Sequence, residues 1–242
     1  MSLKQEIIES CGICKGSGWY DGEACQCLLR FRTYNRLINA GFSRYSLSFV
    51  DREEYQIPFI DHGEEFLNFF LENPEYVEER GLGLYIYSQD KGRGKTTLAH
   101  KLAFDIASKF VTKDSYSTRR TYAFQNVEEL LSSFKHDKDW AWKSTWYVLD
   151  DLGNEDRNTE WKKGLFLSSL QRVFHYRRDK RLPTIVTSNY RPEDLSVIYG
   201  RNLDSLLEIH VDGSIGGSLY RGVQVGGAED LRLASDMTEW PV

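Results

Sequence analysis

The spacing of apolar residues changes several times along the chain, and each change predicts a different element. Between residues 28 and 40 apolar positions recur at helical spacing with arginines between them, which predicts a basic amphipathic helix that ends at Gly41. Residues 42–62 alternate aromatic and polar side chains around Pro58, and we expect a connecting loop there. A second helix is expected over residues 64–79, interrupted at Pro74.

Beyond residue 80 the pattern becomes one of strands alternating with helices. Short apolar runs at 84–87, 146–149 and 184–187 predict buried strands. Helical spacing predicts helices directly after residue 94, at about 126–135 and at about 159–180. Buried strands that alternate with helices indicate a parallel sheet covered on both faces, so the expected fold class is α/β with three αβα layers.

Length and charge narrow the possible functions. A chain of 242 residues can hold one full α/β domain and a small appendage. The formal net charge is -5, so no overall positive field attracts DNA, and any contact with phosphates must be local. No apolar run approaches the roughly 18 to 20 residues of a membrane-spanning helix. We therefore expect a cytoplasmic protein without a membrane partner.

The cysteines are confined to one short, glycine-rich segment near the front of the chain. All four lie there: Cys11, Cys14, Cys25 and Cys27. Their two closely spaced pairs can supply four thiolates to one tetrahedral zinc ion, whereas a disulfide framework would be spread along the chain. Buried free thiols and an iron–sulfur cluster are alternatives. The segment has too few apolar residues for a core, so we expect zinc.

A phosphate-binding loop is predicted where the strand at 84–87 gives way to a helix. Six residues form its candidate nucleotide contacts: Gly92, Arg93, Gly94, Lys95, Thr96 and Thr97. Glycines let backbone N–H groups surround phosphate oxygens, while the lysine reaches the β and γ phosphates and the threonine hydroxyl binds Mg²⁺. Gln89 stands where the Walker A pattern has its first glycine. A structural glycine turn is the alternative, but the strand before and helix after the loop favour ATP.

Two carboxylates follow the strand at 146–149, and an amide follows the strand at 184–187. Asp150 is the candidate acid that orients Mg²⁺ through the water shell of the ion, and Asp151 is the candidate residue that orients or deprotonates the attacking water. Asn189 would lie beside the γ phosphate if its strand neighbours the acidic one, which is the sensor 1 position of AAA+ proteins. Taken alone, these residues are typical of solvated acids and a turn.

Several segments together resemble the bacterial DnaC/DnaI-type replicative helicase loaders and the related IstB-type transposition ATPases. The resemblance rests on residues 148–153, 160–177 and 181–189, and on the cysteine segments 11–19 and 25–27 before a basic helix. It extends to about Arg221. It implies an AAA+ P-loop ATPase, preceded by a zinc module and a basic helix, that self-associates through its AAA+ domain. Its implied partners are a hexameric replicative helicase and single-stranded DNA.

The resemblance also exposes departures at the residues that would act across a subunit interface. Leu206 stands where such loaders usually place an arginine finger, so activation across the interface would come from Arg201 or another basic residue, or be absent. Arg221 lies in a segment similar to the one that carries the sensor 2 arginine of the family, and the alternative is a surface charge. Candidate DNA contacts are the arginines at 30, 32 and 36, those at 119 and 120, and the basic run 177–181.

These expectations divide the chain into four parts. Residues 1–45 form the zinc module with its basic helix, 46–80 a linker and helix, 81–225 the AAA+ ATPase domain, and 226–242 a loosely held tail. The expected function is an ATPase that loads a replicative helicase onto single-stranded DNA. A transposition helper of the IstB type and a nucleotide-binding scaffold without turnover are the alternatives. Gln89 and Leu206 favour the scaffold.

Overall fold

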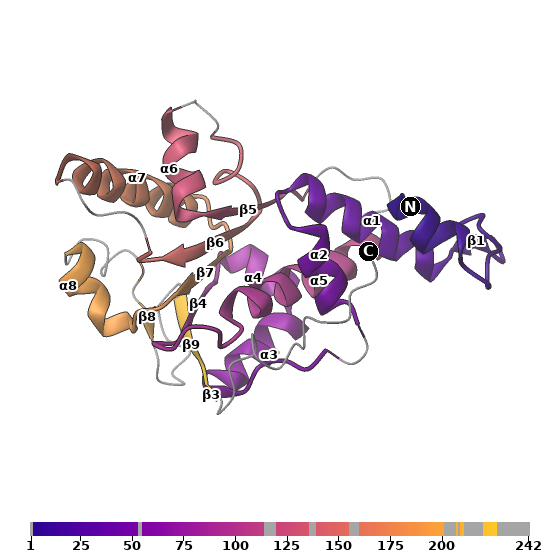
Figure 1. Cartoon of the computed structure of the whole chain (residues 1–242), viewed down its shortest axis with the longest axis horizontal. Coiled ribbons are helices and arrows are strands. Elements are labelled where there is room, and N and C mark those ends of the chain that lie inside the picture. Colours follow the sequence, from indigo (N-terminus) through magenta and orange to yellow (C-terminus); the bar gives the residue numbers. More distant parts are fainter. Residues whose placement is uncertain are drawn as a thin grey trace.

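A central sheet with helices on both faces organises the computed structural model of the chain (Figure 1). The structure describes residues 2–52, 55–113, 120–135, 139–154, 160–200, 207, 209–210 and 220–226. The tail predicted from residue 226 therefore lies outside the described residues, apart from Gly226 itself. In the described ranges, no helix has both the length and the apolar character that crossing a bilayer requires.

The sheet has the strand order β3-β9-β4-β7-β6-β5, and β8 also pairs with β9. Its strands are β3 (Ile60–His62), β4 (Gly83–Tyr87), β5 (Tyr122–Asn126), β6 (Trp146–Leu152), β7 (Thr184–Ser188), β8 (Ile209–His210) and β9 (Tyr220–Val225). All neighbours are parallel except β3, which pairs antiparallel with β9. The predicted parallel sheet is confirmed, with one antiparallel edge strand that the sequence pattern did not indicate.

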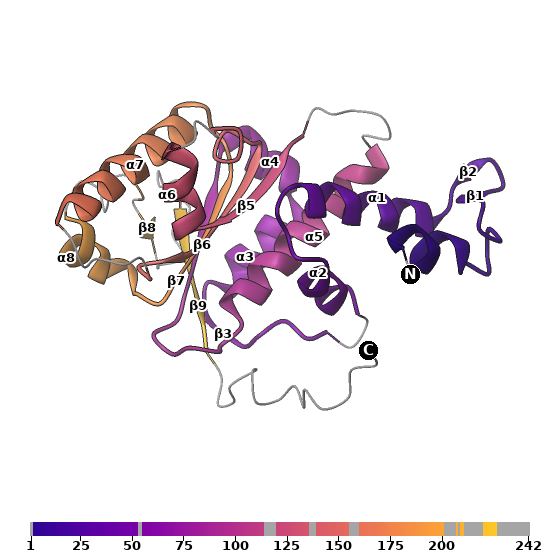
Figure 2. The ribbon, with the colours of Figure 1, turned by 45° about the horizontal axis from the view of Figure 1, so that its top comes forward.

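Alternate residues of the central strands point into two different cores. Leu84 and Ile86 of β4 join the core beneath α1 (Gln26–Asn39), α2 (Arg44–Val50), α3 (Glu64–Glu72), α4 (Pro74–Arg80) and α5 (Lys95–Lys113). Tyr85 and Tyr87 join the core beneath α6 (Val127–Lys135), α7 (Glu160–Asp179) and α8 (Leu195–Tyr199). Figure 2 shows these two helical layers on opposite sides of the sheet. The three-layer αβα prediction is thus confirmed.

The cysteine segment lies at the far end of α1 from the sheet (Figure 1). A short π-helix at Gln5–Glu9 precedes it, and it contains the hairpin strands β1 (Trp19–Tyr20) and β2 (Glu23–Ala24). Helix α1 packs along α5, with the rings of Tyr34 and Phe104 5.5 Å apart. Side chains from before and after residue 45 contribute to one hydrophobic core. The domain boundaries at 45 and 80 stay a prediction.

The main errors of the sequence-based assignment concern short elements. The loop expected at 42–62 contains helix α2, whose N-cap Ser43 accepts a hydrogen bond from the backbone of Ser46, and it ends in strand β3. Strands β5, β8 and β9 were also missed. Each of these elements is short or carries polar residues, so tertiary pairing, and not its own apolar pattern, defines it. The interruption of the second helix at Pro74 is confirmed, because α4 begins there.

Candidate nucleotide site and cysteine cluster

The loop between β4 and α5 has the geometry of a phosphate cradle. Gly92 and Gly94 both adopt left-handed conformations, with φ of 78° and 80°, which residues with a Cβ rarely reach. The buried Lys95 ammonium donates hydrogen bonds to the carbonyls of Ser88 at 3.3 Å and Asp90 at 3.0 Å. No acidic residue occupies the first turn of α5. The loop therefore presents helix N–H groups and a lysine, with no carboxylate in the first turn of α5, as anion binding requires.

Thr96 and Asp150 meet in the structure although 54 residues separate them. The Thr96 hydroxyl donates to the Asp150 carboxylate, with Oγ1 3.0 Å from Oδ1 and 3.2 Å from Oδ2. Burial raises the pKa of Asp150 to about 6, against the lowering effect of hydrogen bonds from Thr187 and Thr96. A hydroxyl and a buried carboxylate in contact form an oxygen pair of the type that Mg²⁺ prefers.

Asp151 and Asn189 are the two other predicted residues at the ends of β6 and β7. The pairing of β6 with β7 changes register between Leu149 and Leu152, and Asp151 within this irregularity has a φ of 60°. Irregularities of this kind re-aim side chains at the ends of strands. Both Asp151 and Asn189 line the cavity beside the loop. The structure thus brings together Asp150, Asp151, Asn189 and the loop residues, as the sequence predicted.

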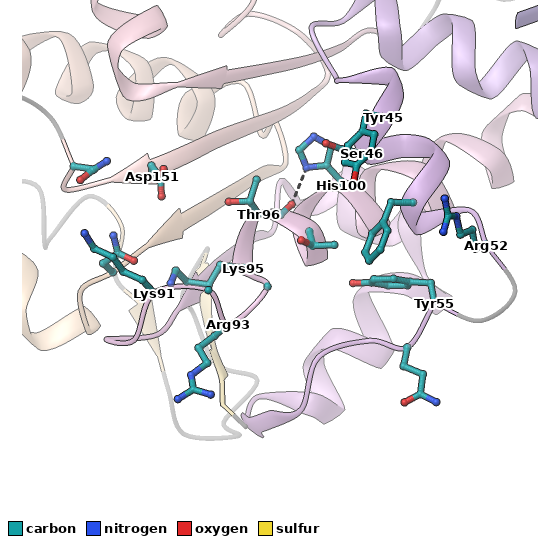
Figure 3. Close-up of a pocket in the computed structure, with 17 residues that line it drawn as sticks. Tyr45, Ser46, Arg52, Tyr55, Lys91, Arg93, Lys95, Thr96, His100 and Asp151 are labelled. Carbon is teal, nitrogen blue, oxygen red and sulfur yellow. Dashed lines mark hydrogen bonds between the residues drawn. The ribbon is translucent and has the colours of Figure 1, made fainter. Parts of the chain in front are cut away.

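The cavity at this site has a volume of about 780 Å³, within the usual range for small-molecule pockets. One side is formed by loop residues 91–97 and by Asp151 (Figure 3). The opposite side is formed by α2 and the chain after it. A triphosphate on the loop would leave its nucleoside facing this second side.

An aromatic wall on that second side was missed by the sequence analysis. Phe49 and Tyr55 pack edge to face with ring centroids 5.5 Å apart, and the Arg52 guanidinium lies 5.9 Å from the Phe49 ring. All three line the cavity, together with Tyr45 (Figure 3). Aromatic rings next to a guanidinium are suited to contact a flat nucleobase. The alternation of aromatic and polar residues in 42–62 was the available signal.

His100 is a second lining residue that the sequence did not single out. Its ring packs between Phe42 and Phe124, with centroid distances of 5.4 and 4.8 Å. Burial lowers the pKa of His100, and Nδ1 lies 2.7 Å from the Thr96 carbonyl oxygen. We infer that the imidazole is neutral and fixes the first turn of α5 against the core.

The four cysteine sulfurs converge at the front end of the chain. All Sγ atoms lie within 4.8 Å of one another, with Cys11 3.9 Å from Cys25 and Cys14 3.4 Å from Cys27. Four thiolates around zinc at about 2.3 Å would have sulfurs about 3.8 Å apart. Although burial raises it, the pKa of Cys14 falls to about 6, because the Gly18 N–H and neighbouring thiols favour the thiolate. The donor set fits one tetrahedral metal ion.

Comparisons with known proteins were made at the level of families, single sequences and solved structures. No protein-family model matches the chain. The replicative helicase loader DnaI of Bacillus subtilis (strain 168) is 29% identical over 164 residues, which are 66% of this chain and 47% of that protein. The match therefore spans about half the length of this curated relative.

Two solved structures share the fold. A DnaI crystal structure matches with a TM-score of 0.54 and 20% identity, covering 79% of this chain and 94% of the other. The crystal structure of the DnaC helicase loader matches with a TM-score of 0.54 and 21% identity, covering 76% and 100%. The chain therefore shares its fold with these two structures. The resemblance to DnaC/DnaI-type loaders predicted from the sequence is likewise confirmed.

The structure does not bring Arg221 to the cavity beside the phosphate loop. Arg221 pairs with Leu84 near the start of β4, whereas the phosphate loop follows Tyr87 at the opposite end of the strand. Three residues of strand correspond to about 10 Å. Its guanidinium lies 5.8 Å from the Phe66 ring, and it does not line the cavity. The sensor 2 assignment thus needs correction, because the strand register buries this arginine elsewhere. Arg201 and Leu206 lie outside the described residues.

The predicted DNA-binding run at 177–181 also needs correction at its first residue. Arg177 is fully buried, and its guanidinium donates to the Thr184 hydroxyl and to the carbonyls of Trp142, Ser144, Thr145 and Pro183. It holds α7 to the ends of β6 and β7 and is not a surface charge. Two other candidates form ion pairs within the protein, Arg30 with Asp51 and Arg120 with Glu78. Arg119 lies outside the described residues.

Proposed function

We propose that the chain is an ATP-hydrolysing loader that delivers a hexameric replicative helicase onto single-stranded DNA. The observation that carries the proposal is the contact of Thr96 with Asp150 beside the Lys95 loop, at the mouth of a cavity of about 780 Å³. This combination suits a magnesium–triphosphate complex. The likeness to DnaI and DnaC supports the choice of a helicase as the partner.

The residues of the site have separate tasks in this proposal. The N–H groups of the loop and the Lys95 ammonium bind the β and γ phosphates, and the Thr96 hydroxyl with Asp150 holds Mg²⁺. Mg²⁺, when bound, neutralises charge on the phosphates. Asp151 orients the attacking water and accepts its proton, while the Asn189 amide contacts the γ phosphate. The aromatic wall formed by Phe49 and Tyr55 contacts the nucleobase.

The front end has its own part in the proposed function. Residues 1–45 hold zinc through Cys11, Cys14, Cys25 and Cys27 and contact the helicase. The exposed side chains of Ile13, Trp19 and Tyr20 on this end supply apolar surface for such a contact. The AAA+ part associates with further copies of itself and contacts single-stranded DNA.

Hydrolysis and helicase capture test the proposal together. We expect steady-state ATP turnover that increases with single-stranded DNA or helicase, and we expect Lys95→Ala to abolish it. Lys101→Ala is the matched control, because Lys101 lies on the same helix and pairs with Asp105 away from the loop. Capture of the replicative helicase by the wild-type chain is the second expected result.

Three results would contradict the proposal, each at a different point. ATP affinity unchanged in Lys95→Ala would refute the phosphate-loop assignment. Nucleotide binding without any turnover, with or without DNA and helicase, would leave a nucleotide-dependent scaffold in place of an ATPase. Failure to capture the helicase, combined with binding of duplex DNA and a transposase, would favour a transposition helper.

A further inference from the structure

A single buried hydroxyl connects the two acidic residues of the site. Thr187 lies on β7 with its side chain fully buried. Its Oγ1 donates a hydrogen bond to Oδ1 of Asp150 at 2.5 Å and accepts one from the backbone N–H of Asp151 at 2.9 Å. A threonine hydroxyl has one hydrogen to donate, and this one is directed to the Asp150 carboxylate.

The hydroxyl takes the place of a missing strand-to-strand hydrogen bond. The pairing of β6 with β7 is regular up to Leu149 and resumes at Leu152, with the two acids between these positions. Asp151 has a φ of 60°, a conformation that a residue with a Cβ adopts at a cost unless its surroundings hold it. The contact with Thr187 holds the Asp151 amide in this orientation, and the Asp151 side chain reaches the cavity (Figure 3).

We propose that Thr187 is the positioning residue of the hydrolytic centre. It sets the rotamer of the Asp150 carboxylate, which faces Thr96, and the backbone direction of Asp151, which faces the cavity. Thr187 does not line the cavity itself, so it acts through these two residues and not on the nucleotide. This inference rests on the proposed ATPase function, and it assigns a role separate from that of Asn189.

Replacing Thr187 by valine removes both hydrogen bonds with little change in volume. We expect Thr187→Val to lower kcat, and to raise the Mg²⁺ concentration for half-maximal turnover, by about 10- to 100-fold, as for other residues that orient metal-holding groups. The affinity for nucleotide without Mg²⁺ should change less than about 3-fold, because the loop at residues 92–97 is untouched. Thr187→Ser keeps the hydroxyl, so its kcat and its Mg²⁺ concentration for half-maximal turnover should lie close to those of the wild-type chain.

The experiment compares the wild-type chain, Thr187→Val, Thr187→Ser and a control, Thr145→Val. Thr145 exchanges hydrogen bonds with Thr121 at the opposite end of the strand, so its variant loses a hydroxyl from the same sheet far from the cavity. Binding of a fluorescent ATP analogue, with and without Mg²⁺, is measured alongside turnover over a series of Mg²⁺ concentrations. A purely structural role would weaken folding in both valine variants without changing the Mg²⁺ requirement.

The possible outcomes separate this inference from the proposed function. Wild-type turnover together with an unchanged kcat and Mg²⁺ requirement in Thr187→Val would overturn the role of Thr187 and leave the ATPase intact. Absence of nucleotide binding by the wild-type chain would overturn the proposed function, and the inference with it. If Thr187→Val does not fold, Thr187→Cys, with its weaker donor, should show an intermediate Mg²⁺ requirement. Wild-type behaviour of that variant would overturn the inference.

Discussion

Replacing Asp150 by asparagine should stabilise the nucleotide-free protein, even though it removes an essential part of the proposed site. Burial raises the pKa of Asp150 from its ordinary value of 3.8 to about 6. Because one pKa unit corresponds to about 1.4 kcal/mol, ionisation of this buried carboxylate lowers the free energy of unfolding by roughly 3 kcal/mol at most. Asparagine keeps the acceptor oxygen for Thr96 and Thr187 without the buried charge.

The sign of the pH dependence follows from the direction of the shift. At pH 8 Asp150 is ionised in both the folded and unfolded states, so the wild-type protein bears the full cost of the buried charge. As the pH falls from 6 to 4 the folded state binds the proton first, and the cost disappears. The advantage of Asp150→Asn should therefore be largest at pH 8 and vanish near pH 4.

Thermal unfolding of both proteins without Mg²⁺ or nucleotide measures the effect. For a chain of this length we expect Asp150→Asn to melt about 5 to 10 °C higher at pH 8 and within a few degrees of wild type at pH 4 to 5. Asp179→Asn is the control, because Asp179 is largely exposed at the end of α7 and should change little. A lower melting temperature for Asp150→Asn at pH 8, or a difference independent of pH, would refute the reasoning.

Four further predictions concern other parts of the molecule. Lowering the pH through about 6 should weaken Mg²⁺-dependent nucleotide binding, because protonation neutralises Asp150. A Mg²⁺ affinity that stays the same from pH 8 to pH 5 would contradict this. Tyr55→Ala should weaken ATP binding by about 10-fold, in line with roughly 1 to 3 kcal/mol for a base stacked on an aromatic ring, and leave inorganic triphosphate binding unchanged, as competition titrations would measure. Zinc removal, or Cys14→Ser, should unfold residues 11–27 and spare the AAA+ fold, which amide exchange can test. Arg177→Met should lower stability by about 3 kcal/mol, since five hydrogen bonds to buried groups are lost; a denaturation midpoint equal to that of wild type would contradict it.

The features that local sequence determines were predicted well. The strand, glycine loop and helix around Lys95 are contiguous, so apolar spacing and two glycines were enough to place them. The acids at 150 and 151 follow directly from the end of a buried strand. The cysteine cluster could also be predicted, because two pairs of thiols in a segment with too few apolar residues for a core favour a shared metal site over other structures.

The features that depend on tertiary register were not predictable from the pattern. Arg177 lies in a run of charges typical of a surface, and the five acceptors around it come from two separate segments, 142–145 and 183–184. Arg221 is buried beside Phe66 because β9 pairs with β4 in a register that one sequence does not reveal. Thr187 is a polar residue inside an apolar strand, and its partner acids become visible only once β6 and β7 are aligned.

A crystal structure of the chain with a non-hydrolysable ATP analogue and Mg²⁺ would show whether the cavity binds the nucleotide as proposed. We expect the triphosphate on the N–H groups of residues 92–97, Mg²⁺ within about 2.1 Å of the Thr96 hydroxyl oxygen, and the base against Phe49 and Tyr55. Nucleotide bound elsewhere, or a cavity without nucleotide at saturating concentration, would contradict it.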